Sequence, residues 1–321
     1  MTKGCDSLEN SLTLNKAKRK NMSKRKLFGR SMPLHLMLLP GIILAVAFHY
    51  VPMIGIVISF QDFNPLLGFF KSHFIGWDNF EYMLNMPDIF QVLWNTIFIA
   101  VLKIITGLVV PIGFALLLNE LNNQFYKRTI QTLIYIPHFL SWVILGGILV
   151  DVLSPSSGIA NHFLKSIGLE PVFFLGNADI FPYVIVVTNI WKEFGFGTII
   201  YLAAITSISP TLYEAAKMDG AKKLQQVLHI TLPGIAPIIV LMATLSLGNV
   251  LNAGFDQIFN LYSPITYRTG DILDTFVYRL GIIDMQYGVA SAVGLFKSVV
   301  ASILIVTSYR LAYKFANYRI F

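Results

Sequence analysis

The residues with the most specific spacing in this chain form a polar insert, at about residues 206–234, between two long apolar segments. Glu214, Lys217 and Asp219 recur there at helical intervals among small residues, so they remain available to water or to another protein. None of them belongs to a pairing of nucleophile and base. The insert is therefore predicted to contact another protein and not to catalyse a reaction.

Local signals predict how this insert folds. Ser209 followed by Pro210 is typical of a helix start, and Glu214 then falls near the positive end of that helix. Gly220 permits a sharp turn, and Pro233 marks the return to apolar sequence. We expect a helix from Pro210, a bend and a second helix. The alternative is a solvated loop.

The elements around the insert must lie in a membrane. The chain is 55% hydrophobic and 13% charged, with a mean hydropathy of +0.66, which is far more apolar than a soluble domain of 321 residues. Six segments are close to the length that a bilayer requires. They are Leu34–Phe60, Val92–Asn119, Thr132–Leu153, Phe181–Ile205, Ile235–Phe259 and Val289–Tyr313.

The basic residues predict the orientation of these spans. Most of the 24 Lys and Arg residues fall on one side if the N-terminus is cytoplasmic, and the opposite side receives only Lys71, Lys165, Arg268 and Arg279. Both termini and the polar insert are then cytoplasmic. We expect residues 1–33 to form a basic, largely disordered tail against membrane lipid, without binding nucleic acid, and residues 34–321 to form the transmembrane domain.

The motifs of the insert resemble those of a known family. The insert is similar to the EAA loop of permease subunits in ABC importers. The matching residues are Glu214-Ala215-Ala216, Asp219-Gly220-Ala221 and, at the end of the loop, Ile230, Leu232 and Pro233. Two further stretches resemble sequences of the carbohydrate-uptake branch of this family, above all polysaccharide and multiple-sugar permeases. They are Trp191-Lys192 with Gly195, and the run from Asp256 to Leu295. The resemblance implies an all-α polytopic membrane protein with six transmembrane helices of the type I importer fold.

That resemblance implies partners as well as a fold. Two ATPase subunits, each holding ATP and Mg, would dock on the EAA loops of two permease chains, the second permease being a different chain. The complex would lie in a bacterial cytoplasmic membrane, and an extracytoplasmic solute-binding protein would deliver a carbohydrate to it.

This chain has no phosphate-binding loop of its own, because Gly294-Leu295-Phe296-Lys297-Ser298 lacks the glycine before the lysine. It is therefore expected to be no enzyme and to bind no cofactor or metal. The docking residues would be Glu214, Ala215, Ala216, Asp219, Gly220, Ala221, Ile230, Leu232 and Pro233.

Polar side chains inside the spans are the candidates for a translocation path. Lys192 and Glu193 are costly at membrane depth and point about 100° apart on a helix, so we do not expect them to pair with each other. Nearby amide side chains could form hydrogen bonds with sugar hydroxyl groups, and nearby aromatic rings could stack on sugar faces. The equal alternative is that these side chains only form contacts between helices. The candidates are Asn189, Trp191, Lys192, Glu193, Tyr201, Asn249, Asn252, Phe255 and Asp256, with Trp142 as a further possibility. Lys103 and Lys297 are expected to hold helices together or to snorkel.

The external loops are expected to receive the binding protein through acidic and aromatic side chains. The alternative is an interfacial aromatic belt with ordinary solvated acids. These residues are Asp62, Asp78, Glu81, Asp88, Glu170, Asp179, Asp271, Asp274 and Asp284, with Trp77, Tyr82, Tyr262, Tyr267 and Tyr278.

Other functions remain open at this point. An ion-coupled secondary transporter could use Lys192, Glu193 and Asp256, but it would not need the EAA loop. A membrane enzyme is disfavoured, because the six histidines show no ligand spacing and Cys5 is the single cysteine. Within the family, a permease for a non-sugar solute is the alternative.

Overall fold

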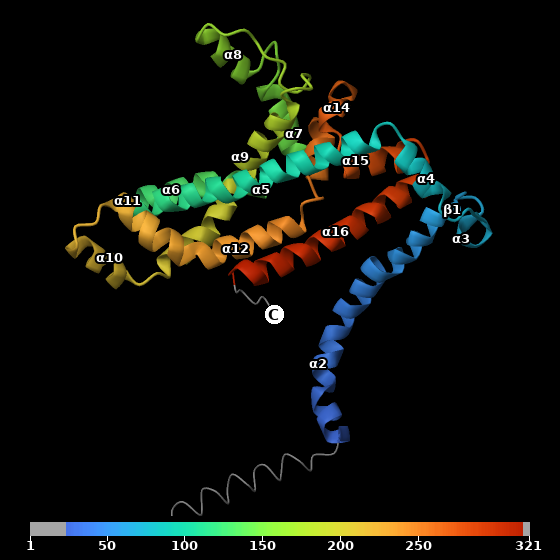
Figure 1. The fold of residues 1–321 in the computed structure, drawn as a ribbon, viewed down its shortest axis with the longest axis horizontal. Helices are drawn as coiled ribbons and strands as arrows, with labels where there is room; N and C mark the ends of the chain where they lie inside the picture. The colour runs from blue at the N-terminus through green and yellow to red at the C-terminus, as the bar shows by residue number, and fades with distance from the viewer. Residues whose placement is uncertain (1–23, 317–321) are drawn as a thin grey trace, which may run out of the picture. The chain divides into compact units, whose positions relative to one another are not determined.

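The computed structural model describes residues 24–316 and divides the chain into two compact units, Met1–Val57 and Ile58–Phe321 (Figure 1). The first unit contains helix α2 (Lys24–Ala45), which continues into a π-helical turn (Val46–Tyr50) and a 3-10 segment (Val51–Phe60) whose last three residues belong to the second unit. The chain stays helical through Pro40, and the wide turn lies just before Pro52. A widened turn accommodates a proline, because proline lacks the N–H group and crowds the preceding carbonyl. Residues 1–23 of the expected tail, with Cys5, lie outside the described residues.

The second unit begins with a small two-stranded sheet and two short helices. Strand β1 (Gln61–Asp62) pairs antiparallel with β2 (His73–Phe74) around the short helix α3 (Gly68–Lys71), and α4 (Asp78–Asn85) follows. The Asn79 side-chain amide fixes α4 to this motif, because its Nδ2 donates to the carbonyls of Ser59 and Gln61 at 3.0 Å each.

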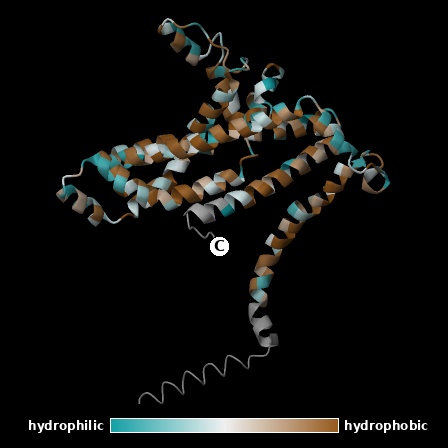
Figure 2. Ribbon diagram, in the orientation of Figure 1, coloured by the Kyte–Doolittle hydropathy of each residue, from teal (hydrophilic) through white to brown (hydrophobic). Residues whose placement is uncertain are grey.

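Four long helices make up the body of this unit: α5 (Ile89–Glu120), α9 (Phe181–Thr206), α12 (Leu232–Gly248) and α16 (Tyr287–Ala316). Hydrophobic residues predominate along them, with polar residues in between (Figure 2). Ala115, Tyr201 and Ile235 meet in one buried cluster that joins α5, α9 and α12. Small residues let the helices approach closely, and a Cβ on Gly197 of α9 would lie 3.1 Å from Pro111 Cγ of α5.

The third expected span, Thr132–Leu153, is not one continuous helix. Helix α6 (Gln124–Tyr135) runs into a 3-10 turn (Ile136–Phe139), and α7 (Trp142–Val152) then leaves at an angle of 104°. Pro137 cannot continue the hydrogen bonding of α6, and the Ser141 hydroxyl caps α7 by accepting from the Ile144 N–H group.

The fifth expected span, Ile235–Phe259, was wrong at its end. Helix α12 stops at Gly248, the chain breaks over residues 249–254, and α13 (Phe255–Leu261) begins separately. Gly254 has a φ of +99°, a left-handed conformation that favours glycine. A helix cannot run through such a residue, so the break is built into the backbone.

Four helices of the described chain are long and apolar enough to cross a membrane, or up to six if two bent pairs each count as one span. The pairs are α6 with α7, and α9 with α10 (Pro210–Met218), which are bent by 68°. The all-α, multi-span prediction is confirmed. The remaining elements are α8 (Ile159–Ser166), α11 (Lys223–Gln226), a π-helical turn (Val227–Thr231), a 3-10 turn (Pro264–Thr266), α14 (Tyr267–Gly270), α15 (Leu273–Tyr278) and a π-helical turn (Arg279–Ile283).

Candidate functional site

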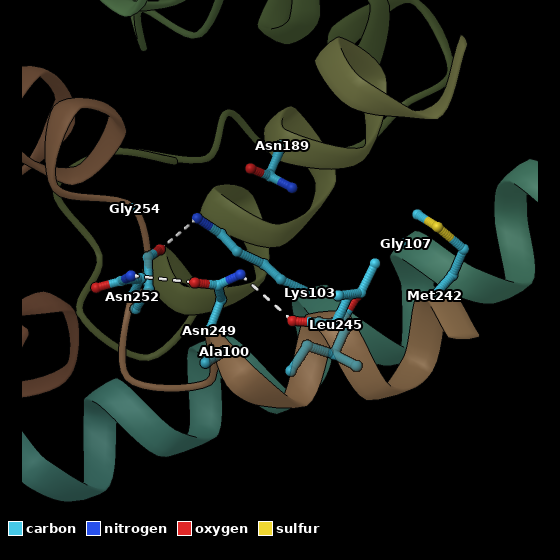
Figure 3. A pocket seen from close by; sticks show the side chains of 12 residues that line it. Ala100, Lys103, Gly107, Asn189, Met242, Leu245, Asn249, Asn252 and Gly254 are labelled. Carbon is cyan, nitrogen blue, oxygen red and sulfur yellow. Dashed lines mark hydrogen bonds between the residues drawn. The ribbon is translucent and has the colours of Figure 1, made fainter. Parts of the chain in front are cut away.

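A cavity of about 410 Å³ lies where α5, α9 and α12 meet the break at residues 249–254 (Figure 3). Its polar lining comes from three asparagine amides, one hydroxyl and one lysine: Asn189, Asn249, Asn252, Ser246 and Lys103. No carboxylate is among the residues that line it. The cavity therefore offers amide donors and acceptors together with one cation, in otherwise apolar surroundings.

Lys103 anchors the break from the facing helix α5. Its Nζ donates to the Ala253 carbonyl at 2.6 Å and to Gln257 Oε1 at 2.5 Å. The Gln257 amide in turn donates to the Ile185 carbonyl and the Thr188 hydroxyl of α9. A broken helix in a membrane needs partners for its free carbonyls, and Lys103 supplies one. The expectation that Lys103 holds helices together is met, but sequence reasoning did not place it in the cavity.

The three asparagines come together from two distant parts of the sequence. Asn189 belongs to α9, while Asn249 and Asn252 belong to the break that follows α12. Asn249 Nδ2 donates to the Leu245 carbonyl at 3.3 Å, and Asn252 Oδ1 accepts from Lys297 Nζ at 2.8 Å. The asparagines among the predicted path residues thus share one cavity. Ser246, which also lines it, carried no sequence signal beyond its place one turn before Asn249.

Lys192 and Glu193 do not line this cavity, and they contact each other, contrary to prediction. Lys192 Nζ lies 3.3 Å from Glu193 Oε1 and donates to the His138 carbonyl at 2.7 Å. Glu193 Oε2 is 2.8 Å from His138 Nδ1, and the His138 ring stacks on Phe196. Long side chains can converge although their Cβ atoms diverge, and the break at residues 136–141 supplies the third partner. This cluster joins α9 to the break between α6 and α7.

The other candidates lie apart from the cavity. Tyr201 is 1% exposed in the α5–α9–α12 core, and its hydroxyl has no hydrogen-bond partner among the described residues. Trp191 is 43% exposed, and Asp256 is exposed at the start of α13. Phe255 borders a second cavity. Trp142 places its ring centroid 5.7 Å from Lys192 Nζ. The geometry favours packing roles for Tyr201 and Trp142.

Three of the acids expected in the external loops are held in ion pairs; Asp179 stays exposed in its pair with Arg268, whereas Asp271 and Asp274 are less accessible. Asp271 is 2% exposed, and its Oδ2 accepts from Arg279 at 2.6 Å. Burial raises the pKa of the Asp271 carboxyl, while hydrogen bonds from Thr275 and Arg279 act in the opposite direction. Asp274 accepts from Lys297 at 2.5 Å. The expectation that Asp271 helps to receive the binding protein was therefore wrong, because its side chain is buried, and Asp274 joins α15 to α16.

The polar insert folds as its local signals predict. Helix α10 begins at Pro210 with Ser209 at its N-cap position, although the Ser209 hydroxyl bonds to Thr211 and not to the backbone. Gly220 has a φ of +77°, and two backbone bonds close the turn, from the Gly220 N–H to the Lys217 carbonyl and from the Ala221 N–H to the Ala216 carbonyl. This pattern is a Schellman motif, which ends a helix at glycine. The second helix, α11, follows at once.

The insert presents one side outward and is held on the other. Of the residues predicted to dock, five are exposed: Glu214, Ala215, Asp219, Gly220 and Pro233. The other four are half-buried: Ala216, Ala221, Ile230 and Leu232. Tyr213 and Thr231 join their hydroxyls across the hairpin at 2.9 Å. Lys223 pairs with Glu120, the last residue of α5, at 2.6 Å. Five of the nine residues predicted to dock are therefore exposed, on a hairpin that is attached to the ends of α5 and α12.

Comparison with known proteins identifies the family. Residues 107–320 match the family described as "Binding-protein-dependent transport system inner membrane component". The chain belongs to this family. The permease is 43% identical over 282 residues to protein LplB of Bacillus subtilis, covering 88% of this chain and 89% of LplB. It is also 43% identical over 284 residues to the polygalacturonan/rhamnogalacturonan transport system permease protein YteP of the same organism, covering 88% of both chains.

The permease also resembles a solved structure. It is similar to a chain of a bacterial ABC transporter involved in the import of the acidic polysaccharide alginate, with a TM-score of 0.83 and 39% identity. The match covers 90% of this chain and 98% of the other. That transporter has also been solved in complex with a periplasmic protein that holds an alginate pentasaccharide. The importer permease fold predicted from the EAA-type motifs is confirmed.

Proposed function

We propose that this permease forms, with a second permease chain, the membrane path of an ATP-driven importer for an acidic oligosaccharide. The cavity between α5, α9 and the break at residues 249–254 carries the proposal. Membership of the binding-protein-dependent transport family supplies the transport class, and the cavity supplies the cargo chemistry.

The lining of the cavity suits sugar hydroxyl groups. An asparagine amide presents donors and an acceptor at once, and so can bind a hydroxyl that needs both. Asn189, Asn249 and Asn252 approach the cavity from two sides, with Ser246 beside them. YteP and the alginate transporter, both similar to this chain over most of its length, are named for polysaccharide cargo. Their names and this lining point to the same class of solute.

Lys103 indicates the charge of the cargo. Its ammonium group uses two of its three donors on Ala253 and Gln257, which leaves one for the cavity. Ionisable groups within a membrane are expensive and mark the pathways of charged solutes. Because no carboxylate lines the cavity, the carboxylate of a uronic acid residue is the group that this lysine would bind.

The hairpin of α10 and α11 is the proposed docking element for the ATPase. Its exposed Glu214 and its left-handed Gly220 form a compact projection that a groove on an ATPase could receive. ATP and Mg would be held by that partner. The basic side of the chain, which includes this hairpin, would be cytoplasmic in a bacterial membrane. A solute-binding protein would deliver the cargo from the opposite side.

Uptake measurements test this function. Proteoliposomes would contain the permease, its second permease chain and ATPase, with the binding protein added outside. ATP-dependent entry of labelled galacturonate or mannuronate oligosaccharides, in preference to neutral arabino-oligosaccharides of equal length, is the expected result. Entry without ATP under an ion gradient, or preference for the neutral sugars, would contradict the proposal.

A further inference from the structure

A second cavity, of about 540 Å³, lies between α13, α15 and α16. The rings of Phe255, Tyr278 and Tyr287 line it, together with the polar groups of Asp274 and Ser291. None of the residues that line the first cavity lines this one. Consecutive residues of the chain nevertheless line the two cavities, because Gly254 borders the first and Phe255 borders the second.

The aromatic rings are held in fixed positions. The Phe255 and Tyr278 centroids are 5.6 Å apart, and Phe259 packs against both, at 5.2 Å from Phe255 and 4.9 Å from Tyr278. Helix α13 is anchored in the core by Gln257 and Ile258, which are 0% exposed. Helix α13 therefore presents a rigid aromatic side at the cavity, as a stacking surface requires.

A polar bridge connects this surface to the first cavity. Lys297 Nζ donates to Asn252 Oδ1 at 2.8 Å and to Asp274 Oδ1 at 2.5 Å, and these two acceptors line the first and second cavities respectively. An ammonium group has three donors, and a carboxylate has a second oxygen, so the bridge keeps one donor and one acceptor for a ligand.

We infer that the second cavity is an additional saccharide subsite, in which Phe255 and Tyr278 stack on a sugar residue beside the Asp274–Lys297 pair. An oligosaccharide would then lie across the helix break, with consecutive residues in the two cavities. The inference rests on the proposed function. A lipid chain would leave the ion pair without a polar partner, whereas a sugar ring combines an apolar face with hydroxyl groups that suit both parts of this wall.

Chain-length dependence of transport tests the subsite. The complete transporter, with its binding protein, would be assayed with a galacturonate disaccharide and a pentasaccharide. Phe255→Leu and Tyr278→Leu retain apolar volume but remove the ring face. We expect each to lower kcat/KM for the pentasaccharide about tenfold and to leave the disaccharide value unchanged. Phe163→Leu in α8 is the control, because Phe163 is 64% exposed and far along the chain from the cavity.

The outcomes separate this inference from the proposed function. If the unmodified transporter imports neither saccharide, the proposed function itself fails. If it imports both and the Leu variants reduce both equally or not at all, the second cavity is no subsite. Loss of the second permease chain when the Leu variants are purified would show instead that this aromatic side is an interface between the two permeases.

Discussion

Two lysines perform the same task at two helix breaks. Lys103 donates to the Ala253 carbonyl at 2.6 Å, and Lys192 donates to the His138 carbonyl at 2.7 Å. Both carbonyls lie where a helix is interrupted and lack a partner one turn later. They differ in surroundings, since Lys192 contacts a carboxylate and Lys103 borders a cavity without one. Both lysines therefore anchor a helix break, and only Lys103 also lines the cavity to which we propose that cargo binds.

Replacing Lys103 with glutamine tests that difference. Lys103→Gln keeps an amide donor for the break but removes the charge. Because this variant lacks the charge, we expect its kcat/KM for acidic oligosaccharides to fall roughly tenfold, equivalent to about 1.4 kcal/mol. Its uptake of neutral analogues should be unchanged. Lys192→Gln, the matched control, should show no dependence on cargo charge. Equal losses for acidic and neutral sugars in Lys103→Gln would leave the lysine with its anchoring role alone.

Gly220 carries a second prediction at the residue scale. Its φ is +77°, and a Cβ there would meet no atom within 4 Å, so a substitution is limited by backbone conformation and not by a clash within the chain. Left-handed geometry costs a β-branched residue more than the about 1–2 kcal/mol of an ordinary residue, and asparagine less. ATP-driven uptake should follow the order Gly, Asn, then Val.

Gly220→Asp separates charge from conformation, because aspartate tolerates this geometry about as well as asparagine. If the turn docks closely on an ATPase, Asp should abolish uptake while Asn retains most of it, and both variants should reach the membrane in normal amounts. Similar uptake by the Asn, Asp and Val variants would show that the turn is not part of the docking surface.

At the scale of elements, close helix contact depends on particular glycines. A Cβ on Gly195 of α9 would lie 2.0 Å from the Ile134 carbonyl oxygen of α6, a backbone atom that cannot turn away. Gly195→Ala should therefore separate α6 from α9 and destabilise the detergent-purified permease by about 1–3 kcal/mol. Gly113 of α5 has no atom within 4 Å of such a Cβ, so Gly113→Ala should be neutral or slightly stabilising. Thermal unfolding midpoints of the two variants, compared with the unmodified chain, provide the measurement.

The elements predicted correctly are those determined by neighbouring residues. Ser209, Pro210 and Gly220 lie within one short stretch, and together they define the hairpin of α10 and α11. The helix breaks depend on distant partners instead. Lys103 is 150 residues from Ala253, and Lys192 is 54 residues from His138. Apolar composition continues through both breaks, so hydropathy extended Ile235–Phe259 and Thr132–Leu153 as single spans.

The candidate site was predictable in part for the same reason. Asparagines are conspicuous in an apolar segment, and Asn189, Asn249 and Asn252 do meet at one cavity. Which face of a helix lines a cavity depends on tertiary packing, and for that reason Tyr201 was grouped with them although it lies in the core. The Asp271–Arg279 pair was missed because both residues are polar and lie in what the sequence shows as an external loop.

At the scale of the second unit, α5 connects two functionally different ends. It has 32 residues and so is about 48 Å long, more than the roughly 30 Å hydrocarbon core of a bilayer. Its first residue follows α4 and the β1–β2 motif, while its last residue, Glu120, pairs with Lys223 of the hairpin (Figure 1). The hairpin and the small sheet must then lie on opposite sides of the membrane. The distribution of basic residues predicts that the hairpin is on the cytoplasmic side.

Cysteine labelling tests this orientation. In a Cys5→Ser background, Leu66→Cys and Met218→Cys each introduce a single thiol at a position that is 94% and 88% exposed, respectively. A membrane-impermeant maleimide should label Leu66→Cys in intact spheroplasts and Met218→Cys only after permeabilisation. In permeabilised membranes, the co-expressed ATPase should slow labelling of Met218→Cys, because docking covers α10, and should leave Leu66→Cys unaffected. The reverse sidedness would place the hairpin outside, where no ATPase could reach it, and the coupling role assigned to α10 would then be untenable.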